Sequence, residues 1–251
     1  MSSLFLVRHG RTQWTEEHRF AGWGNAPLNK TGVDEAVFAA KTLKASGYAF
    51  DVCFTSCLER AKHTANIIHD ELGIPRDVLQ YKWRLNERHY GALQGQLRAD
   101  MRQAYGVENV KQWRNNYYAQ PPELTTDDPR WQEQLGSLPE VPLDQHPHSE
   151  SMFQAAQRCL PFWQEQIVPE LKNNKNVLII AHTNSIRSII ASIEGFNDEQ
   201  SAAFRIATAV PRHYKFNKAL KPVKVRDLSA SPKTRLRHWA TRKRLDWLSR
   251  S

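Results

Sequence analysis

Short apolar runs alternate along this chain with segments of helical periodicity. The runs at 4–7, 50–55 and 177–181 are long enough for buried strands and too short for buried helices. Apolar residues spaced three or four positions apart predict helices over 31–47, 58–72, 151–171 and 186–193. This alternation indicates crossover units, so we predict an α/β fold in three layers, with a mainly parallel central sheet between helices.

Cap and breaker residues predict where the helices begin and end. Thr31 can cap the first helix, which we expect to end at Gly47. The second should stop at Gly73. In the third, Pro161 should kink the helix and Pro169 should end it or kink it again.

The segment 121–147 contains six of the chain's 13 prolines, so we expect it to be mostly loop, forming a wall or lid over a site. Just before it, 111–117 is typical of the end of a helix. His146-Pro147-His148 could contribute to a metal site, but spacing fixes no third ligand. We therefore interpret it as a surface loop.

Charged side chains follow each predicted strand. Arg8 and His9 end the first, His182 ends the run 177–181, and Arg60 follows the run 50–55 in the first turn of a helix. If these strands are parallel, all four side chains emerge at one sheet edge, where α/β proteins bind ligands. Two histidines and two arginines would make a strongly positive pocket, which suits a phosphoryl group.

Three motifs extend this observation. They are Arg8-His9-Gly10, the eleven residues 85–95 (LNERHYGALQG) and Ala181-His182-Thr183-Asn184-Ser185. Together they resemble the cofactor-dependent phosphoglycerate mutases of the histidine phosphatase superfamily, from about residue 4 to about residue 217. The first motif is common to the superfamily, whereas the run 85–95 is more specific to the mutase branch.

The resemblance implies catalytic roles. His9 would be the phosphoryl carrier, kept neutral by the charges of Arg8 and Arg60, which would also hold the phosphate oxygens. His182 would stabilise the transferring group, and Glu87 would donate and accept the proton of the leaving alcohol.

It also implies a substrate-binding set around these groups. Arg88, Tyr90, Arg98 and Arg114 match positions that hold the substrate carboxylate and second phosphate. The remaining matched positions are Gly10, Arg11, Thr12, Thr15, Ala21, Gly22, His89, Asn115, Thr183 and Asn184.

Several of these residues depart from the family pattern. Asn115 lacks the cation of a second anion subsite, the Thr183 side chain should crowd a backbone contact, and Arg11 should strengthen anion binding beside the nucleophile. Such changes are compatible with phosphoryl transfer and count against efficient glycolytic mutase activity. The positions are Arg11, Thr15, Ala21, Arg98, Asn115 and Thr183, where the family usually has Glu, Asn, Thr, Lys, Arg and Gly.

The function that the resemblance implies is a phosphoglycerate mutase of glycolysis and gluconeogenesis. It would interconvert 3-phosphoglycerate and 2-phosphoglycerate through phosphorylated His9, primed by 2,3-bisphosphoglycerate, without a metal and as a homo-oligomer (dimer or tetramer). One alternative is a histidine phosphatase acting on bisphosphoglycerate or another small phosphomonoester. Another is a divergent member whose basic tail binds an anionic partner.

The composition also indicates where in the cell the protein is located. The first apolar run is four residues long and no run reaches membrane-spanning length, so we expect neither a signal peptide nor a membrane partner. The three cysteines, Cys53, Cys57 and Cys159, form no zinc or disulfide pattern and are typical of buried residues in a reducing compartment. We therefore expect a cytoplasmic protein.

The net charge of +9 belongs entirely to the C-terminal segment 218–251, whereas residues 1–217 are balanced. We therefore divide the chain into a catalytic domain, 1–217, and a basic tail, 218–251. Ser231-Pro232 can start a helix in the tail with an apolar face, docked on its own domain or on a partner subunit. This interpretation is favoured over binding to nucleic acid or a membrane.

Overall fold

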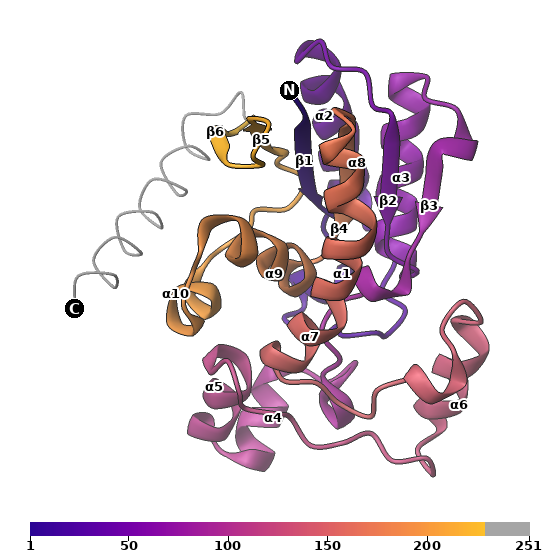
Figure 1. Cartoon of the computed structure of the whole chain (residues 1–251). Coiled ribbons are helices and arrows are strands. Elements are labelled where there is room, and N and C mark those ends of the chain that lie inside the picture. Colours follow the sequence, from indigo (N-terminus) through magenta and orange to yellow (C-terminus); the bar gives the residue numbers. More distant parts are fainter. Residues whose placement is uncertain (229–251) are drawn as a thin grey trace.

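The computed structural model describes residues 1–228. A six-stranded sheet in the order β3-β2-β4-β1-β5-β6 forms its centre (Figure 1). The strands are β1 (Ser3–Arg8), β2 (Val52–Thr55), β3 (Leu79–Tyr81), β4 (Asn176–Ala181), β5 (Arg212–Phe216) and β6 (Pro222–Asp227).

The first four strands in that order are parallel, which confirms the predicted mainly parallel sheet. Arg8 pairs with Ala181 and Thr55 pairs with Ile180, so β1, β2 and β4 end together at one edge. The strands β5 and β6 are antiparallel to their neighbours, which makes the sheet mixed.

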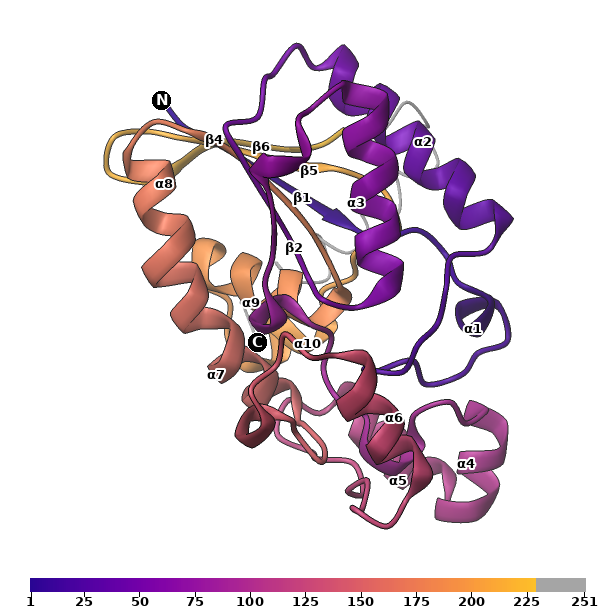
Figure 2. The same ribbon diagram turned by 90° about the vertical axis from the view of Figure 1, so that its right-hand side faces the viewer.

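Helices cover both faces of the sheet, as predicted. On one face, α2 (Lys30–Ala45) and α3 (Glu59–Leu72) pack against Phe5 and Val7. On the other face, α7 (Met152–Phe162), α8 (Val168–Lys172) and α9 (Thr183–Glu194) pack against Leu4 and Leu6 (Figures 1 and 2). Successive residues of β1 face opposite layers, so its continuous apolar run serves both.

Two helix boundaries differ from the sequence prediction. The N-cap of α2 is Asn29, not Thr31, because Asn29 is extended and its side chain accepts the Gly32 N–H at 2.8 Å. That helix ends at Ala45, before Gly47. The α3 helix ends as predicted, at Gly73 in the left-handed conformation.

The two prolines of the 151–171 segment do not end its helix. A π-helical turn, Trp163–Ile167, lies between Pro161 in α7 and Pro169 in α8, and the helical path continues to Lys172. Proline removes a backbone donor from the helical ladder, and a π turn is one way of accommodating that loss.

Most of the 121–147 segment is irregular, as predicted. The sequence analysis did not predict the helix at its middle, α6 (Pro129–Ser137), which is capped by Asp128 and has proline at the first helical position. The remaining helices of the described residues are short: α1 (Gln13–Glu16), α4 (Arg98–Tyr105), α5 (Val107–Asn115) and α10 (Asp198–Ala203), with 3₁₀ turns at Arg76–Val78, Trp83–Leu85, Gly91–Leu93 and Leu143–Gln145.

The expected tail falls partly outside the described residues. Residues 222–227 lie beyond position 217, yet they form β6 and pair with β5 in the sheet. The division at 217 remains a prediction. The expected helix from Ser231 lies outside the described residues.

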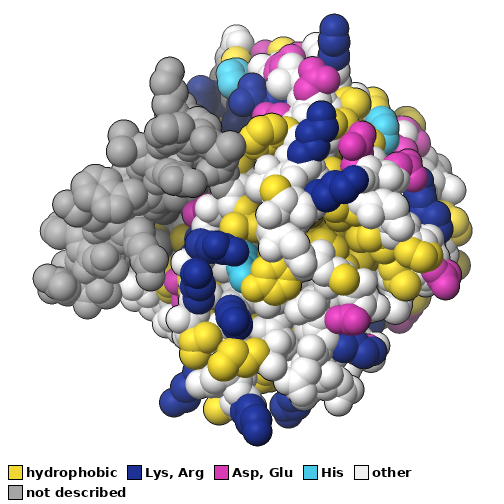
Figure 3. Space-filling model, turned by 90° about the horizontal axis from the view of Figure 1, so that it is seen from above, with side chains coloured by type: hydrophobic (Ala, Val, Ile, Leu, Met, Phe, Trp, Pro, Cys, Tyr) yellow, Lys and Arg dark blue, Asp and Glu magenta, His cyan; other side chains and the backbone are white. Residues whose placement is uncertain are grey.

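The described surface mixes charges of both signs. Lys and Arg are interspersed with Asp and Glu on the face shown in Figure 3. Within residues 1–228, no helix is long and apolar enough to cross a membrane. The cysteines Cys53, Cys57 and Cys159 are buried and free, as predicted.

Candidate active site

His9 lies directly after β1, where its backbone N–H donates to the Ala181 carbonyl of β4 at 3.0 Å. Its Nδ1 is 2.7 Å from the Gly10 carbonyl oxygen. A carbonyl only accepts hydrogen bonds, so Nδ1 carries the proton and Nε2 keeps its lone pair. The ring is therefore fixed with a nucleophilic nitrogen facing away from the main chain.

Arg60, in the first turn of α3, is buried beside that nitrogen. Its Nε lies 3.3 Å from His9 Nε2, and its two terminal nitrogens donate to the carbonyl oxygens of Gly24, at 3.1 Å, and Gly22, at 2.6 Å. Burial lowers the pKa of Arg60 to about 10, so it remains charged at neutral pH. Arg60 thus connects the loop Gly22–Gly24 to the histidine.

His182 ends β4 beside His9, with 4.9 Å between ring centroids. The Ser56 hydroxyl accepts the Leu58 N–H at 3.2 Å and lies 2.6 Å from His182 Nε2. This contact fixes the orientation of the His182 ring, and either the hydroxyl or Nε2 can be its donor. Among the described residues, Nδ1 has no hydrogen-bond partner.

Both imidazoles are kept neutral. Burial lowers the pKa of His9 well below its usual value, and the charges of Arg60 and Arg8 lower it further. The pKa of His182 is also lowered well below its usual value, first by burial and then by Arg60. A neutral imidazole can act as a nucleophile, whereas an imidazolium cannot.

The Glu87 carboxylate sits at the N-terminus of α9, although its position in the sequence is remote from that helix. Oε1 accepts from the backbone N–H groups of Arg88 (2.8 Å) and Asn184 (3.1 Å) and from the Asn184 amide (2.7 Å). Oε2 accepts only from Thr183 N, at 3.2 Å. The helix N-terminus favours the negative charge and leaves Oε2 the less occupied oxygen.

These groups surround an arginine-lined cavity of about 270 Å³. Its lining includes the predicted residues Arg8, His9, Thr15, Ala21, Gly22, Arg60, Glu87, Tyr90, Arg98, Arg114, Asn115, Thr183 and Asn184. His182 is fully buried behind His9 and does not line it.

The cavity carries a large excess of positive charge. Glu87 is the one carboxylate among its described lining residues, against seven arginines. They are Arg8, Arg19, Arg60, Arg98, Arg114, Arg187 and Arg205. A concave, partly desolvated surface of this composition is suited to a polyanionic ligand.

Besides His182, five predicted residues do not line the cavity. Arg11 is directed away and pairs with Glu35 at 2.9 Å, so it does not add the charge expected beside His9. Gly10 allows close packing, because a Cβ there would lie 2.2 Å from the Gly32 oxygen. Thr12 caps α1.

The other two predicted residues outside the cavity, Arg88 and His89, are fully buried. The Arg88 guanidinium stacks on the Tyr90 ring at 4.3 Å. His89 contacts the Gln134 side chain at 2.7 Å, and burial lowers its pKa to about 4.

The sequence analysis missed six residues that line the cavity, Arg19, Phe20, Met152, Arg187, Arg205 and Ile206. Arg187 carried a recognisable signal, because it follows Asn184 by one helical turn and interrupts the apolar isoleucines of α9. Its guanidinium donates to the Asn184 oxygen at 2.7 Å, and the Asn184 amide in turn donates to Glu87. Arg187 therefore helps to orient the group that holds the carboxylate.

The pair His146 and His148 packs against aromatic rings. His148 stacks on Trp131 with 4.1 Å between centroids, and its Nδ1 lies 2.7 Å from the Leu124 oxygen. Residues 1–228 contain no group of three or more His, Cys, Asp or Glu side chains arranged to hold a metal ion.

The fold and the site together define an α/β protein with one neutral histidine, His9, at the wall of an arginine-lined cavity and a second, His182, buried beside it. The chain belongs to the histidine phosphatase superfamily (branch 1), whose family model matches residues 4–130 and 120–225.

Solved structures of similar fold include three phosphatases. A mycobacterial glucosyl-3-phosphoglycerate phosphatase is 21% identical, with a TM-score of 0.68 and coverage of 91% of this chain and 99% of that one. A putative α-ribazole-5′-phosphate phosphatase from Escherichia coli is 26% identical (TM-score 0.67; coverage 91% and 96%). The α-ribazole phosphatase from Shigella flexneri is 23% identical (TM-score 0.67; coverage 90% and 96%).

Proposed function

We propose that this protein is a phosphatase that hydrolyses a small phosphomonoester through a phosphohistidine at His9. The observation that carries the proposal is the neutral His9 Nε2, fixed beside Arg60 at the wall of the arginine-lined cavity. A nucleophile, a proton carrier and cations for the phosphoryl oxygens are all present around one space.

In the first step, His9 Nε2 attacks phosphorus and the bond to the leaving oxygen breaks. The phosphomonoester brings one proton on its phosphate group, and Glu87 Oε2, the carboxylate oxygen with a single donor, relays that proton to the leaving oxygen. Arg8 and Arg60 bind the equatorial oxygens. His182 packs beside His9, with 4.9 Å between ring centroids, and supports that ring during the transfer. The alcohol then leaves, and His9 carries the phosphoryl group.

In the second step, water attacks the phosphohistidine. Glu87 takes a proton from the water as the N–P bond breaks and passes it to the departing phosphate, which leaves His9 neutral and Glu87 a carboxylate. The low pKa of His9 supports this step, because the released imidazole keeps its proton on Nδ1 and is not protonated at Nε2. The cycle therefore returns both residues to their starting states.

The nature of the neighbours favours hydrolysis over isomerisation. Two are described as phosphatases of phosphorylated small molecules and a third as a putative one, with substrates named as glucosyl-3-phosphoglycerate and α-ribazole-5′-phosphate. We therefore infer that the substrate is a phosphomonoester and that water is the final acceptor.

The number of arginines supports a second anionic group on the substrate. Arg8 and Arg60 are enough for one phosphoryl group, whereas Arg98 and Arg114 add charge elsewhere in the lining. Asn115 lacks a cation, but the unexpected Arg187 lines the same cavity. Arg19 lines it as well and is paired with Glu17. A phosphorylated carboxylate or a bisphosphate would match this arrangement.

The excess of arginines in the cavity lining also supports a second candidate function, phosphoglycerate mutase. Arg98 and Arg114 would hold the distal group of 2,3-bisphosphoglycerate, which supplies the priming phosphoryl group when bound. Thr183 does not prevent the backbone contact at its position, because its N–H still reaches Glu87. The expected homo-oligomer and the cytoplasmic location remain predictions.

One paired assay separates the candidates. Purified protein is given 3-phosphoglycerate with and without 2,3-bisphosphoglycerate, and a panel of phosphomonoesters, while inorganic phosphate and 2-phosphoglycerate are measured. The proposal expects phosphate release that His9→Ala abolishes and His63→Ala, outside the cavity, preserves. Primer-dependent isomerisation without phosphate release would instead establish the mutase.

A further inference from the structure

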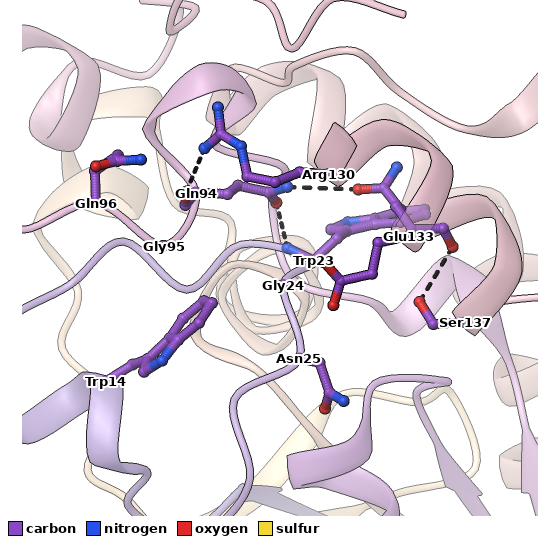
Figure 4. Close-up of a pocket in the computed structure, with 11 residues that line it drawn as sticks. Trp14, Trp23, Gly24, Asn25, Gln94, Gly95, Gln96, Arg130, Glu133 and Ser137 are labelled. Carbon is purple, nitrogen blue, oxygen red and sulfur yellow. Dashed lines mark hydrogen bonds between the residues drawn. The ribbon is translucent and has the colours of Figure 1, made fainter. Parts of the chain in front are cut away.

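A second cavity, of about 310 Å³, lies beside the arginine-lined one. Figure 4 shows Trp14 on one side of it and Arg130, Glu133 and Ser137 of α6 on the other. The loops 23–25 and 94–96 complete its lining, and no lining residue is shared with the arginine-lined cavity. Its volume is at the lower end of the range for small-molecule sites, roughly 300 to 1,000 Å³, and suits one small ring.

The positive charge of this cavity is neutralised within the protein. Arg130 is the one cation among its described lining residues, and its Nε and one terminal nitrogen bind both oxygens of Asp128 at 2.9 and 2.6 Å. Its other terminal nitrogen donates to the carbonyl oxygens of Ala92 and Gln94 at 3.1 and 2.6 Å. The guanidinium is thereby committed to the protein, so the cavity does not select an anion.

The remaining polar groups of this amide-lined cavity are the Glu133 carboxylate and neutral side chains of both hydrogen-bonding kinds. Asn25, Gln96 and Gln134 offer amides, Ser137 offers a hydroxyl, and the Gln94 amide is bonded to Trp23 and Gln134. Gln134 is 5% exposed, and its amide nitrogen has no hydrogen-bond partner among the described residues. Donors and acceptors mixed in this way match hydroxyl groups, which do both.

An aromatic surface accompanies these amides. Trp14 is partly exposed and its ring edge lies against two glycines: a Cβ at Gly24 would be 2.7 Å from Cζ3, and one at Gly95 would be 3.5 Å from Cη2. A side chain at Gly24 would therefore displace the indole, and the glycines hold the ring at the edge of the cavity. The C–H face of a sugar ring packs on an aromatic ring of this kind while its hydroxyls reach neighbouring amides.

We propose that the amide-lined cavity is a second binding site that takes an uncharged sugar ring, with Trp14 as its platform and the amides as hydroxyl partners. This site is separate from the arginine-lined cavity, and the proposal does not depend on the proposed phosphatase activity. The two meet at the loop Gly22–Gly24, where Gly22 lines one cavity and Gly24 the other.

Binding is measured by saturation-transfer NMR and calorimetry with methyl glucoside, methyl galactoside and methyl mannoside as probes. We expect at least one to bind wild-type protein and His9→Ala equally, with or without saturating inorganic phosphate. Trp14→Ala should weaken binding about tenfold or more, through loss of the stacking surface. Thermal unfolding and circular dichroism show whether that variant is folded.

Two exposed asparagines give a matched pair of variants that carries no risk to the core. Asn25→Ala, in the cavity, should weaken binding several-fold, whereas Asn109→Ala, on α5 outside it, should leave binding unchanged. The proposal is overturned if no sugar binds, if adenosine binds in place of the sugars, or if phosphate displaces the sugar. Equal binding by Asn25→Ala and folded Trp14→Ala would overturn it as well.

Discussion

The arginine-lined and amide-lined cavities meet at one short loop and use arginine in opposite ways. In the first, Arg60 and Arg187 are oriented by uncharged partners, mostly carbonyl oxygens, so their positive charge is left for a ligand. In the second, Arg130 is paired with Asp128. The comparison teaches that the partner of an arginine in a cavity wall, more than its presence, decides whether the cavity attracts an anion.

Among the variants that separate the two cavities, Glu87→Gln should have the largest effect, on turnover in the arginine-lined cavity. The amide preserves the shape but cannot carry a proton between the leaving oxygen and water, so turnover should fall about 10²- to 10⁴-fold. Steady-state kinetics measure the loss, and sugar affinity should not change. Glu165→Gln, on the exposed side of the 163–167 turn, is the control. Turnover close to wild type would remove Glu87 from the chemistry.

Arg60→Met should lower turnover by about 10²- to 10³-fold, the scale of one lost charge-stabilising group. It should also change the pH profile. The charge of Arg60 lowers the pKa of His9, so its removal raises that pKa. Neutral His9 is the active form, so activity falls as pH drops through its pKa.

The acid limb of kcat/KM should accordingly lie well below pH 6.5 in the wild type and move upward in Arg60→Met. Arg102→Met, an exposed arginine of α4 outside the cavity, should leave the profile in place. An acid limb at the same pH in all three proteins would show that Arg60 does not set the His9 pKa.

Arg114→Met should act on substrate binding. For a phosphorylated carboxylate, KM should rise about tenfold because one charge-assisted contact is lost. For p-nitrophenyl phosphate, which has no second anionic group, KM should change little. Lys111→Met, one turn earlier on α5, controls for general charge. An equal rise for both substrates would disprove a separate second anion subsite.

Asp128→Asn should have the smallest effect. It tests the amide-lined cavity, because it removes the carboxylate that pairs with Arg130. Asparagine also caps helices, so α6 should persist, at a cost of about 0–1 kcal/mol for the lost ion pair. The freed charge of Arg130 should raise the affinity of the amide-lined cavity for glucuronate relative to glucose several-fold. Calorimetry measures the ratio, and an unchanged ratio would mean that Asp128 does not neutralise the cavity.

The sequence analysis predicted the fold and the edge where the histidines meet because apolar runs ending in charged residues are a local signal. Glu87 was connected to His9 only through the family resemblance, since nothing local places residue 87 at the N-terminus of α9. Arg11 shows the converse: its proximity to His9 in the sequence suggested a ligand contact, but the side chain pairs with Glu35.

The amide-lined cavity could not be predicted from the sequence, because its parts come from four segments without a shared motif. One of them, α6, was hidden by neighbouring prolines, although Asp128 followed by Pro129 is itself a helix-start signal. Which way a side chain such as Arg130 turns depends on tertiary packing that periodicity does not encode.

The most direct test of the central claim is to trap and map the phosphoenzyme. The protein is quenched during turnover of a ³²P-labelled phosphomonoester, digested and sequenced by mass spectrometry. We predict an acid-labile, alkali-stable phosphoryl group on His9 that is absent from His9→Ala. A phosphoryl group on another residue, or labelling that persists in His9→Ala, would contradict the account.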